Sequence, residues 1–456
     1  MSAPIETSAH DLLQQPNGEG AALTFSTTGS IQTSNPFFTP LGNGRSCASC
    51  HQESQGWSVT PDGLAVRFEQ SNGTDPIFKL VDGATFPNAP VDTLEQKRVA
   101  YTLLLTKGLV RIGLPLPPAA EFTLSDTDDP YGYASAAEMS LFRRPLPTAN
   151  LKFSSTVMWD GRETAIDANS KNCIAGALPA KCYASIDFDL LHQANSAVRG
   201  HAEAAIDLSA ADQRAIVDFE KTLFTAQIFS TDAGNLNDGG ALGGPAALAK
   251  NDFYFGINDA VSGDYVTGMP FNRNSMTMFS AWRHSADLPP LQNPTAIELA
   301  RTSIARGEDI FNSKQFTING VGGFGDELNG STRQGSCTSC HSTPNSGTHS
   351  IARLFNTGVS DGSLRTPDLP LYSLKNKMTG EIVTSTDPGA ALTSGKWQDI
   401  GRFKVPSLRA IEARSPYFHN GALKELSDVV KFYDRRFKIG FTPQEVADLT
   451  AFLKVL

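Results

Sequence analysis

The sequence predicts a mainly α-helical chain built from two related domains, with long loops and a few short strands. The length of 456 residues exceeds what one ordinary hydrophobic core supports, so two or three domains are expected. One short cysteine–histidine motif occurs once in each half, and each half closes with a similar amphipathic pattern. The 39 glycines and 27 prolines indicate many loops and argue against a compact bundle of helices.

The composition is that of a soluble globular protein, with 40% hydrophobic and 19% charged residues. No apolar run approaches the roughly 20 residues that a membrane helix needs. The net charge of −9 argues against nucleic-acid binding and would suit a protein partner with a basic face. The opening MSAPIETSAHDLL lacks the basic start and apolar core of a signal peptide, but a mature chain restarted with methionine would look the same.

The repeated motif is a pair of cysteines three apart with a histidine directly after the second. It reads SCASCHQ at 46–52 and SCTSCHS at 336–342. Two thiols at this spacing can bond to the two vinyl groups of haem, and the imidazole that follows can then bind the iron. The sequence therefore predicts two covalent c-type haems. Their attachment and iron-binding residues would be Cys47, Cys50 and His51 for the first haem, and Cys337, Cys340 and His341 for the second.

Two other readings of paired cysteines are weaker. Four thiols could bind zinc, and a redox dithiol would need a thioredoxin-like βαβ context that the sequence lacks. Because c-type haem is attached outside the bacterial cytoplasm, the motif predicts a periplasmic location. The remaining cysteines, Cys173 and Cys182, lie nine apart, and in an oxidising compartment they predict a disulfide that closes a small loop; two buried free thiols are the alternative.

Each half ends in a predicted amphipathic helix. LSAADQRAIVDFEKTLF at 208–224 and FTPQEVADLTAFLKVL at 441–456 both start with a Ser or Thr followed three residues later by an acid, then continue with an apolar stripe at helical spacing. Upstream, VMWDGRE at 157–163 and YFHNGAL at 417–423 share a glycine. Motif, connecting region, glycine loop and closing helix thus follow in the order expected of two cytochrome c-like domains.

The domain boundaries follow from this order. We predict an N-terminal domain over 1–231, a linker and connector over 232–294, and a C-terminal domain over 295–456. The linker begins with DAGNLNDGGALGGPAALA, which is rich in Gly, Asn and Ala. TAIELARTSIARGEDIF at 295–311 predicts the helix that opens the second domain.

These segments together resemble the bacterial dihaem cytochrome c peroxidases and their MauG-type relatives. The resemblance spans nearly the whole chain and rests on both CxxCH motifs, on MWDGRE at 158–163, on ARGEDIF at 305–311 and on FKVPSLRAIEARSPYFHNGALKEL at 403–426. It implies a peroxide-reacting haem in the N-terminal domain and a low-spin, electron-handling haem in the C-terminal domain. It also implies a calcium ion between the domains, although no local carboxylate cluster marks one.

The resemblance implies three catalytic residues in the first site. Trp159 would lie between the haems, and Gln193 and Glu203, ten residues apart, would line the peroxide pocket. Cleavage of a peroxide needs a base that moves a proton from the inner to the outer oxygen and a polar group that holds the molecule. A carboxyl in an apolar pocket would have the raised pKa that suits this transfer.

This chain departs from the family pattern at several positions. Ala197 stands where relatives often have proline, and His192 and His201 are close enough in sequence to act as alternative acid–base groups. No histidine occurs from 52 to 158, where many relatives have one that caps the first iron. We therefore predict an open sixth position at the first haem and no need for reductive activation.

The sixth ligand of the second haem is a further departure. Relatives use a methionine or, in the MauG type, a tyrosine from the C-terminal part. No methionine follows Met378, and Phe418 stands where some relatives have methionine. Tyr417 is the predicted ligand and Met378 the alternative; Tyr417 could equally be a packed aromatic ring. A tyrosinate oxygen would stabilise ferric iron and lower its potential.

The predicted function is reduction of hydrogen peroxide at the first haem. The two electrons required would come from a small periplasmic cytochrome c or copper protein through the second haem. The alternatives are a MauG-like enzyme that oxidises a partner protein and, from a different class, a non-enzymatic dihaem electron carrier. A homodimer is compatible with each of these functions.

Overall fold

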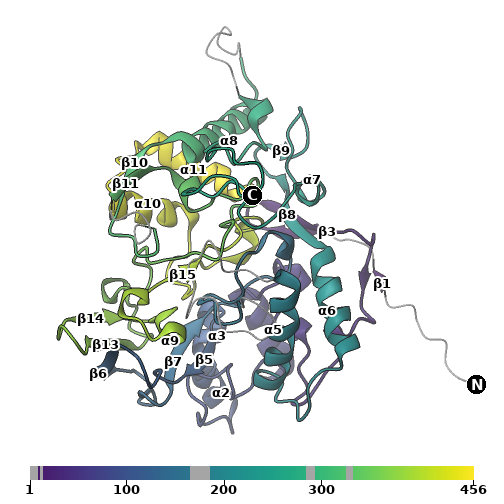
Figure 1. The fold of residues 1–456 in the computed structure, drawn as a ribbon. Coiled ribbons are helices and arrows are strands. Elements are labelled where there is room, and N and C mark those ends of the chain that lie inside the picture. Colours follow the sequence, from purple (N-terminus) through teal and green to yellow (C-terminus); the bar gives the residue numbers. More distant parts are fainter. Residues whose placement is uncertain (1–8, 11–13, 165–184, 284–292, 325–331) are drawn as a thin grey trace, which may run out of the picture.

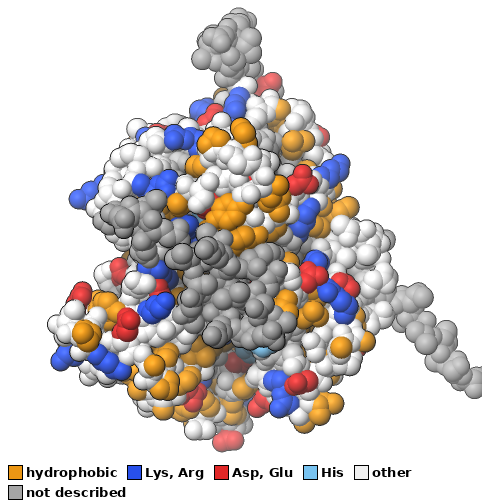
Figure 2. Space-filling view, viewed as in Figure 1, with side chains coloured by type: hydrophobic (Ala, Val, Ile, Leu, Met, Phe, Trp, Pro, Cys, Tyr) orange, Lys and Arg blue, Asp and Glu red, His pale blue; other side chains and the backbone are white. Residues whose placement is uncertain are grey.

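The computed structural model describes residues 9–10, 14–164, 185–283, 293–324 and 332–456 (Figure 1). Helices α8, α10 and α11 lie together in one half of the molecule, and α5 and α6 lie side by side in the other. Basic and acidic side chains are interspersed over the face shown in Figure 2. Cys173 and Cys182, the predicted disulfide, fall outside the described residues.

The helices are mostly short. Their bounds are α1 Pro61–Ser71, α2 Leu94–Ala100, α3 Thr102–Lys107, α5 Ile186–Gly200, α6 Ala210–Thr222, α7 Pro245–Ala249, α8 Ala296–Ser313, α9 Ala391–Ser394, α10 Leu426–Phe437 and α11 Pro443–Lys454. Within the described part of the chain, none of them is long and apolar enough to cross a membrane.

The strands form several small antiparallel sheets. Their bounds are β1 Ala9–His10, β2 Gln14–Asn17, β3 Gly20–Ser26, β4 Ile31–Gln32, β5 Val110–Leu114, β6 Phe122–Asp128, β7 Met139–Arg143, β8 Leu223–Ser230, β9 Gly234–Asn235, β10 Phe316–Asn319, β11 Thr332–Gly335, β12 Leu354–Phe355, β13 Leu371–Asn376, β14 Ile382–Ser385 and β15 Phe403–Lys404. The larger sheets have the strand orders β2-β3-β8-β9 and β14-β13-β6, and the pairs are β1-β4, β5-β7, β10-β11 and β12-β15.

One sheet connects the two halves of the chain. Strand β6 pairs with β13, with Phe122 opposite Asn376 and Asp128 opposite Leu371. Its buried face adds Phe122, Tyr372 and Leu374 to a shared core. Main-chain hydrogen bonds thus join segments that lie about 250 residues apart in the sequence. The two halves of the chain therefore share one sheet.

The prediction of a mainly α-helical fold is confirmed in part. The predicted helices are present, but the strands make the described structure a mixed one. The additional strands arise where long loops pair with distant segments, which local periodicity does not reveal. The domain boundaries at 231 and 294 stay predictions.

The helix starts follow the predicted capping chemistry. The Ser209 hydroxyl accepts a hydrogen bond from the Asp212 amide at 3.1 Å at the start of α6. Thr442 and Glu445 form a reciprocal capping box at the start of α11. The opening helix of the predicted second domain is α8, which Thr295 caps in the same way.

Helices α8 and α11 pack closely, and this pair supports one of the two cavities described below. At the point of closest approach, a Cβ atom on Gly307 would lie 2.0 Å from the backbone oxygen of Asp448. The Asp448 carboxylate accepts hydrogen bonds from Arg306 Nε at 2.7 Å and from Ser303 Oγ at 2.5 Å. Glycine is therefore required by packing rather than by an unusual backbone angle.

Gly307→Ala is expected to destabilise the protein by about 2 kcal/mol, because overpacking forces α8 and α11 apart. A thermal melt measures this as a lower Tm. Gly200→Ala is the matched control, because Gly200 also lies in a helix but has no atom within 4 Å of the added Cβ. That change should leave Tm unchanged or raise it slightly. Equal effects of the two changes would contradict the close contact.

Candidate active site

The two CxxCH segments have the same local structure. Each forms a single 3-10 turn, Cys47–Ser49 and Cys337–Ser339, preceded by a serine that caps it. In both turns the amide of the capping serine donates to the hydroxyl of the serine three residues later, at 3.0 and 3.1 Å. The repeated S-C-x-S-C-H motif thus forms a turn that is capped by its own two serines, and this turn brings two thiols and an imidazole to one cavity.

Both motif histidines hold their Nδ1 atom against a backbone carbonyl. The Nδ1 of His51 lies 3.1 Å from the Trp57 carbonyl, and that of His341 lies 2.6 Å from the Gly347 carbonyl. Because a carbonyl only accepts, Nδ1 carries the proton and Nε2 keeps its lone pair for a metal. Burial lowers the pKa of both histidines to about 4, so both are neutral at pH 7.

Each motif lines its own cavity. A cavity of about 210 Å³ contains Cys47, Cys50 and His51 in its wall. A second cavity, of about 240 Å³, is lined by the corresponding residues of the other motif and mostly by apolar side chains. Paired thiols beside a correctly oriented imidazole, at the edge of a large apolar cavity, fit a covalently attached haem.

The zinc reading does not fit this arrangement. The four thiols are divided between two cavities, and burial raises the pKa of each to about 11 or 12. Among the described residues, no three His, Cys, Asp or Glu side chains are grouped so that they could hold a metal ion. A calcium site between the domains accordingly stays a prediction from the resemblance.

Trp159 lies in the wall of both cavities. Its ring nitrogen donates to the carbonyl of Arg144 at 2.8 Å, and its ring meets His419 edge-on at 6.2 Å between centroids. Other residues line both cavities as well: Arg144, Pro145, Leu146, Pro147, Lys404, Pro406 and Ser407. The wall between the cavities is thus one layer of side chains from both halves of the chain.

A buried charge group fixes the residue after this tryptophan. Arg143 donates to Asp160 at 2.6 Å and to Asp387 at 2.6 Å, and all three side chains are almost fully buried. Burial alone would raise the pKa of the Asp160 carboxyl, but the charges of Arg143 and Arg162 hold it well below its usual range. The Asp160 carboxylate is therefore ionised at neutral pH.

Of the predicted peroxide-pocket residues, only one lines the first cavity. Gln193, on α5, is in the wall. Glu203 lies beyond the end of α5, is exposed, and accepts a hydrogen bond from Asn43 Nδ2 at 2.8 Å, so the structure does not bring it into the lining. His192 is also outside the lining, with its ring 2.5 Å from Glu163.

Other polar groups line the first cavity instead, and of these the sequence analysis singled out only His201. His201 is in the wall with Asp82 and Arg45, and its Nδ1 lies 2.6 Å from an Asp82 oxygen. Glu220, on α6, is buried in the same wall, and burial raises its pKa to about 8. No sequence signal marks Asp82, because 119 residues separate it from His201.

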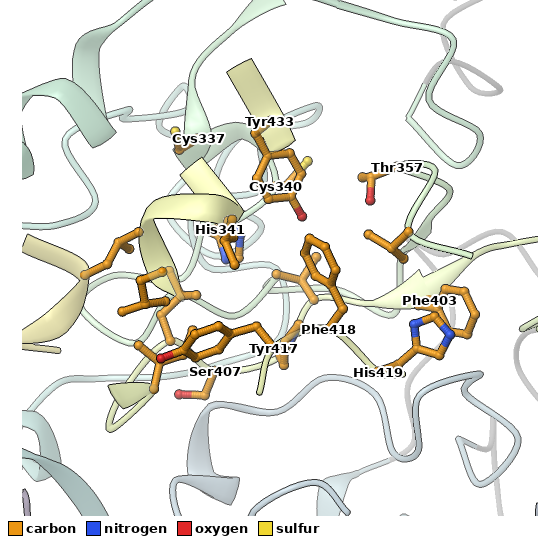
Figure 3. A pocket seen from close by; sticks show the side chains of 18 of the residues that line it. Cys337, Cys340, His341, Thr357, Phe403, Ser407, Tyr417, Phe418, His419 and Tyr433 are labelled. Carbon is orange, nitrogen blue, oxygen red and sulfur yellow. The ribbon is translucent and has the colours of Figure 1, made fainter. Parts of the chain in front are cut away.

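The second cavity contains two tyrosines, and Figure 3 shows how they differ. The hydroxyl of Tyr433, on α10, points into the cavity towards Phe418 and Thr357. The hydroxyl of Tyr417 points the other way, towards Glu412 at 3.4 Å. Burial raises the pKa of both phenols, so both are neutral until a metal displaces the proton. Met378 is 91% exposed and does not line this cavity.

No family model matches the chain, but single relatives do. Cytochrome-c peroxidase IdrP1 of Denitromonas iodatirespirans is 32% identical over 143 residues, which are 26% of this chain and 36% of the relative. Cytochrome c551 peroxidase of Nitrosomonas europaea is 31% identical over 134 residues, 29% of this chain and 34% of the relative. This chain is similar to cytochrome c peroxidases. The resemblance predicted from the motifs is confirmed, over little more than a third of these relatives' length.

One solved structure is similar over most of its length, a MauG-like protein associated with microbial copper homeostasis. It covers 93% of this chain and 88% of its own chain, with 16% identity and a TM-score of 0.35.

The raised pKa of Glu220 predicts a pH-dependent stability. An unfolded glutamate has a pKa of about 4.3, so between that pH and about 8 the folded state keeps a proton that the unfolded state releases. Stability contributed by this group therefore falls as the pH rises. Glu220→Gln should match the parent in Tm near pH 4 and exceed it at pH 8.

Asp218→Asn is the control for this measurement, because Asp218 is an exposed carboxylate on the same helix. It should not reproduce the pH-dependent gain. A Glu220→Gln protein whose Tm follows that of the parent from pH 5 to pH 8 would contradict the buried, protonated carboxyl.

Proposed function

We propose that this protein is a periplasmic dihaem c-type peroxidase that reduces hydrogen peroxide at the first cavity with electrons received through the second. The observation that carries the proposal is the pair of cavities, each with its own CxxCH turn, that share Trp159 in their common wall. The similarity to proteins named cytochrome c peroxidases supports the same reaction. The periplasm follows from where c-type haem is attached.

The attachment residues are those of the two motifs. Cys47 and Cys50 would hold the first haem and Cys337 and Cys340 the second, with His51 and His341 as iron ligands. When bound, such a haem supplies an iron that can bind peroxide and exchange electrons. The apolar lining excludes water, and Gln193 offers an amide that can hold a peroxide by hydrogen bonds.

Trp159 is proposed to couple the two centres. Its ring contributes to both walls, and its hydrogen bond to Arg144 holds it in place. A small cytochrome c or copper protein is the proposed electron donor. Peroxide reduction consumes two electrons, so two redox centres allow the oxidation to be shared. We retain 1–231 and 295–456 as the proposed peroxide and electron-transfer domains.

Tyr433 is our proposed sixth ligand of the second haem, in place of Tyr417. It is supported by the hydroxyl that points into the cavity lined by His341, whereas the Tyr417 hydroxyl is directed to Glu412. Phe403, Phe418 and Val359 surround it with apolar surface. Met378 is not retained, because its side chain is exposed to solvent.

Oxidation of a partner protein is the second candidate function, and Tyr433 is the observation that favours it. An anionic oxygen ligand stabilises ferric iron, which disfavours simple electron transfer at high potential. In that case electrons would pass from a protein substrate through the side chains of the shared wall to the oxidised centre. The distinguishing measurement is turnover of peroxide with reduced carriers.

The main test is production with a c-type haem-attachment system. We expect two covalent haems per chain in a pyridine haemochrome spectrum, and consumption of peroxide with a reduced cytochrome or copper protein. The double change Cys47→Ala and Cys50→Ala should leave one haem and abolish peroxide turnover. Colourless protein would overturn the haem sites, and two haems without any reaction with peroxide would mean an electron carrier.

Tyr433→Phe is expected to change the low-spin electron paramagnetic resonance signal of the second haem, because an oxygen ligand is lost. Tyr417→Phe is the matched control and should leave that signal as it is. The reverse result would return the ligand to Tyr417. An unchanged signal in both variants would mean that neither tyrosine binds the iron.

A further inference from the structure

The first cavity contains a histidine held by a buried carboxylate. His201 caps the C-terminal end of α5, and its Nδ1 lies 2.6 Å from Oδ2 of Asp82. Both residues line the cavity that also contains His51 and Gln193. The His201 side chain is 37% exposed and that of Asp82 only 5%, so the pair runs from a buried anchor to an accessible ring.

The anchor is rigid. The other Asp82 oxygen accepts from Arg45 Nη1 at 2.6 Å. Arg45 is itself fixed by backbone carbonyls, with Nε donating to Pro76 at 2.7 Å and Nη2 to Ile77 at 2.5 Å. Burial would raise the pKa of the Asp82 carboxyl, but the hydrogen bond from His201 and the charge of Arg45 hold it below its usual value.

This anchoring fixes the role of each ring nitrogen. An ionised carboxylate only accepts, so Nδ1 of His201 carries the proton that it donates to Asp82. Nε2 then has the free lone pair. A carboxylate behind an imidazole also stabilises the protonated ring, which makes Nε2 a better base.

The other titratable side chains near the cavity are less suited to accept a proton there. Glu203 is exposed and held by Asn43 outside the lining. Glu220 lines the cavity, but burial raises its pKa to about 8, so at pH 7 it is mostly protonated. His192, on the same helix as Gln193, is directed to Glu163 at 2.5 Å and does not line the cavity.

We propose that His201 is the acid–base group of the first cavity and that Asp82, held by Arg45, is its positioning residue. The inference rests on the proposed peroxide reduction and replaces the sequence-based assignment of Glu203. It identifies a further catalytic residue in the first cavity, one that the CxxCH and WDGR segments do not contain.

In this proposal His201 carries one proton from the first oxygen of hydrogen peroxide to the second. Nε2 of His201 takes the proton from one oxygen of hydrogen peroxide, so an O–H bond breaks and an N–H bond forms. The imidazolium, stabilised by Asp82, then returns this proton to the other oxygen, which leaves as water when the O–O bond breaks. Over the full cycle, two electrons from the donor protein and two protons from solvent convert hydrogen peroxide to two waters.

Cyanide binding tests the base without peroxide turnover. Hydrogen cyanide binds a ferric haem as cyanide, so a neighbouring base must take its proton. In the haem-loaded protein, His201→Gln should slow cyanide association at the first haem about 100-fold, within the usual range for a lost acid–base group. The rate of peroxide reduction should fall by a similar factor, with KM changed less than kcat.

The pH profile provides an independent readout. His201→Gln should change the pH profile of cyanide association, because the group that accepts the proton is lost. Asp82 contacts the ring, and Arg45 donates to the backbone carbonyl of His201. The other titratable and charged groups nearby are His51 in the same cavity and Arg199 and Glu203 on the adjoining chain. Asp82→Asn should alter this profile only while His201 is present.

Two variants serve as comparisons. His192→Gln removes an exposed histidine from the same helix and should leave both rates unchanged. Glu203→Gln should have a much smaller effect than His201→Gln. Asp82→Asn leaves Arg45 buried without a full counter-charge, which destabilises the folded state, so His201→Gln is the decisive change.

The possible results distinguish the role of His201 as a base from the peroxidase function of the protein. Normal cyanide binding in His201→Gln together with slow binding in Glu203→Gln would overturn the proposal and return the role to Glu203. A low-spin first haem that becomes high-spin only in His201→Gln would also overturn it, because His201 would then be an iron ligand. Protein that binds cyanide as expected but does not reduce peroxide would support the base and refute the peroxidase function.

Discussion

The contact of Arg143 with Asp160 and Asp387 is the interaction on which the rest of the site depends. Asp160 directly follows Trp159, and Asp387 comes from the other half of the chain. Buried charges are costly to desolvate, and loss of one partner leaves an uncompensated charge, so the three groups can be stable only together. The ion group therefore fixes the layer of side chains that separates the cavities, and with it the position of the tryptophan ring.

The two cavities contain the same CxxCH turn but differ in the other residues that line them. The first contains the polar set of Arg45, Asp82, His201 and Gln193, which suits movement of protons. The second is lined mainly by aromatic and aliphatic side chains, with Tyr433 as its inward-pointing polar group near Thr357. The same sequence motif thus lies in two different surroundings, and residues outside the motif set the chemistry that each cavity can support.

The sequence predicted what depends on short spacing. The CxxCH turns and the caps of α6 and α11 follow from residues within a few positions of one another, whereas the place of Trp159 was implied by the family resemblance. Pairings over long distances were not accessible, such as β6 with β13 or Asp82 with His201. Tyr433 was missed for another reason: inside an amphipathic helix a tyrosine has the pattern of an ordinary core residue.

The shared wall also constrains the order in which the molecule can be completed. Lys404, Pro406 and Ser407 line the first cavity, although the cysteines of that cavity lie more than 350 residues earlier in the chain. A chain emerges from its N-terminus, so the thiols of the first site are available long before the segment that encloses them. A group attached to Cys47 and Cys50 at an early stage would therefore lie in an incomplete pocket. The pocket would exclude solvent only after the second half of the chain had folded against it.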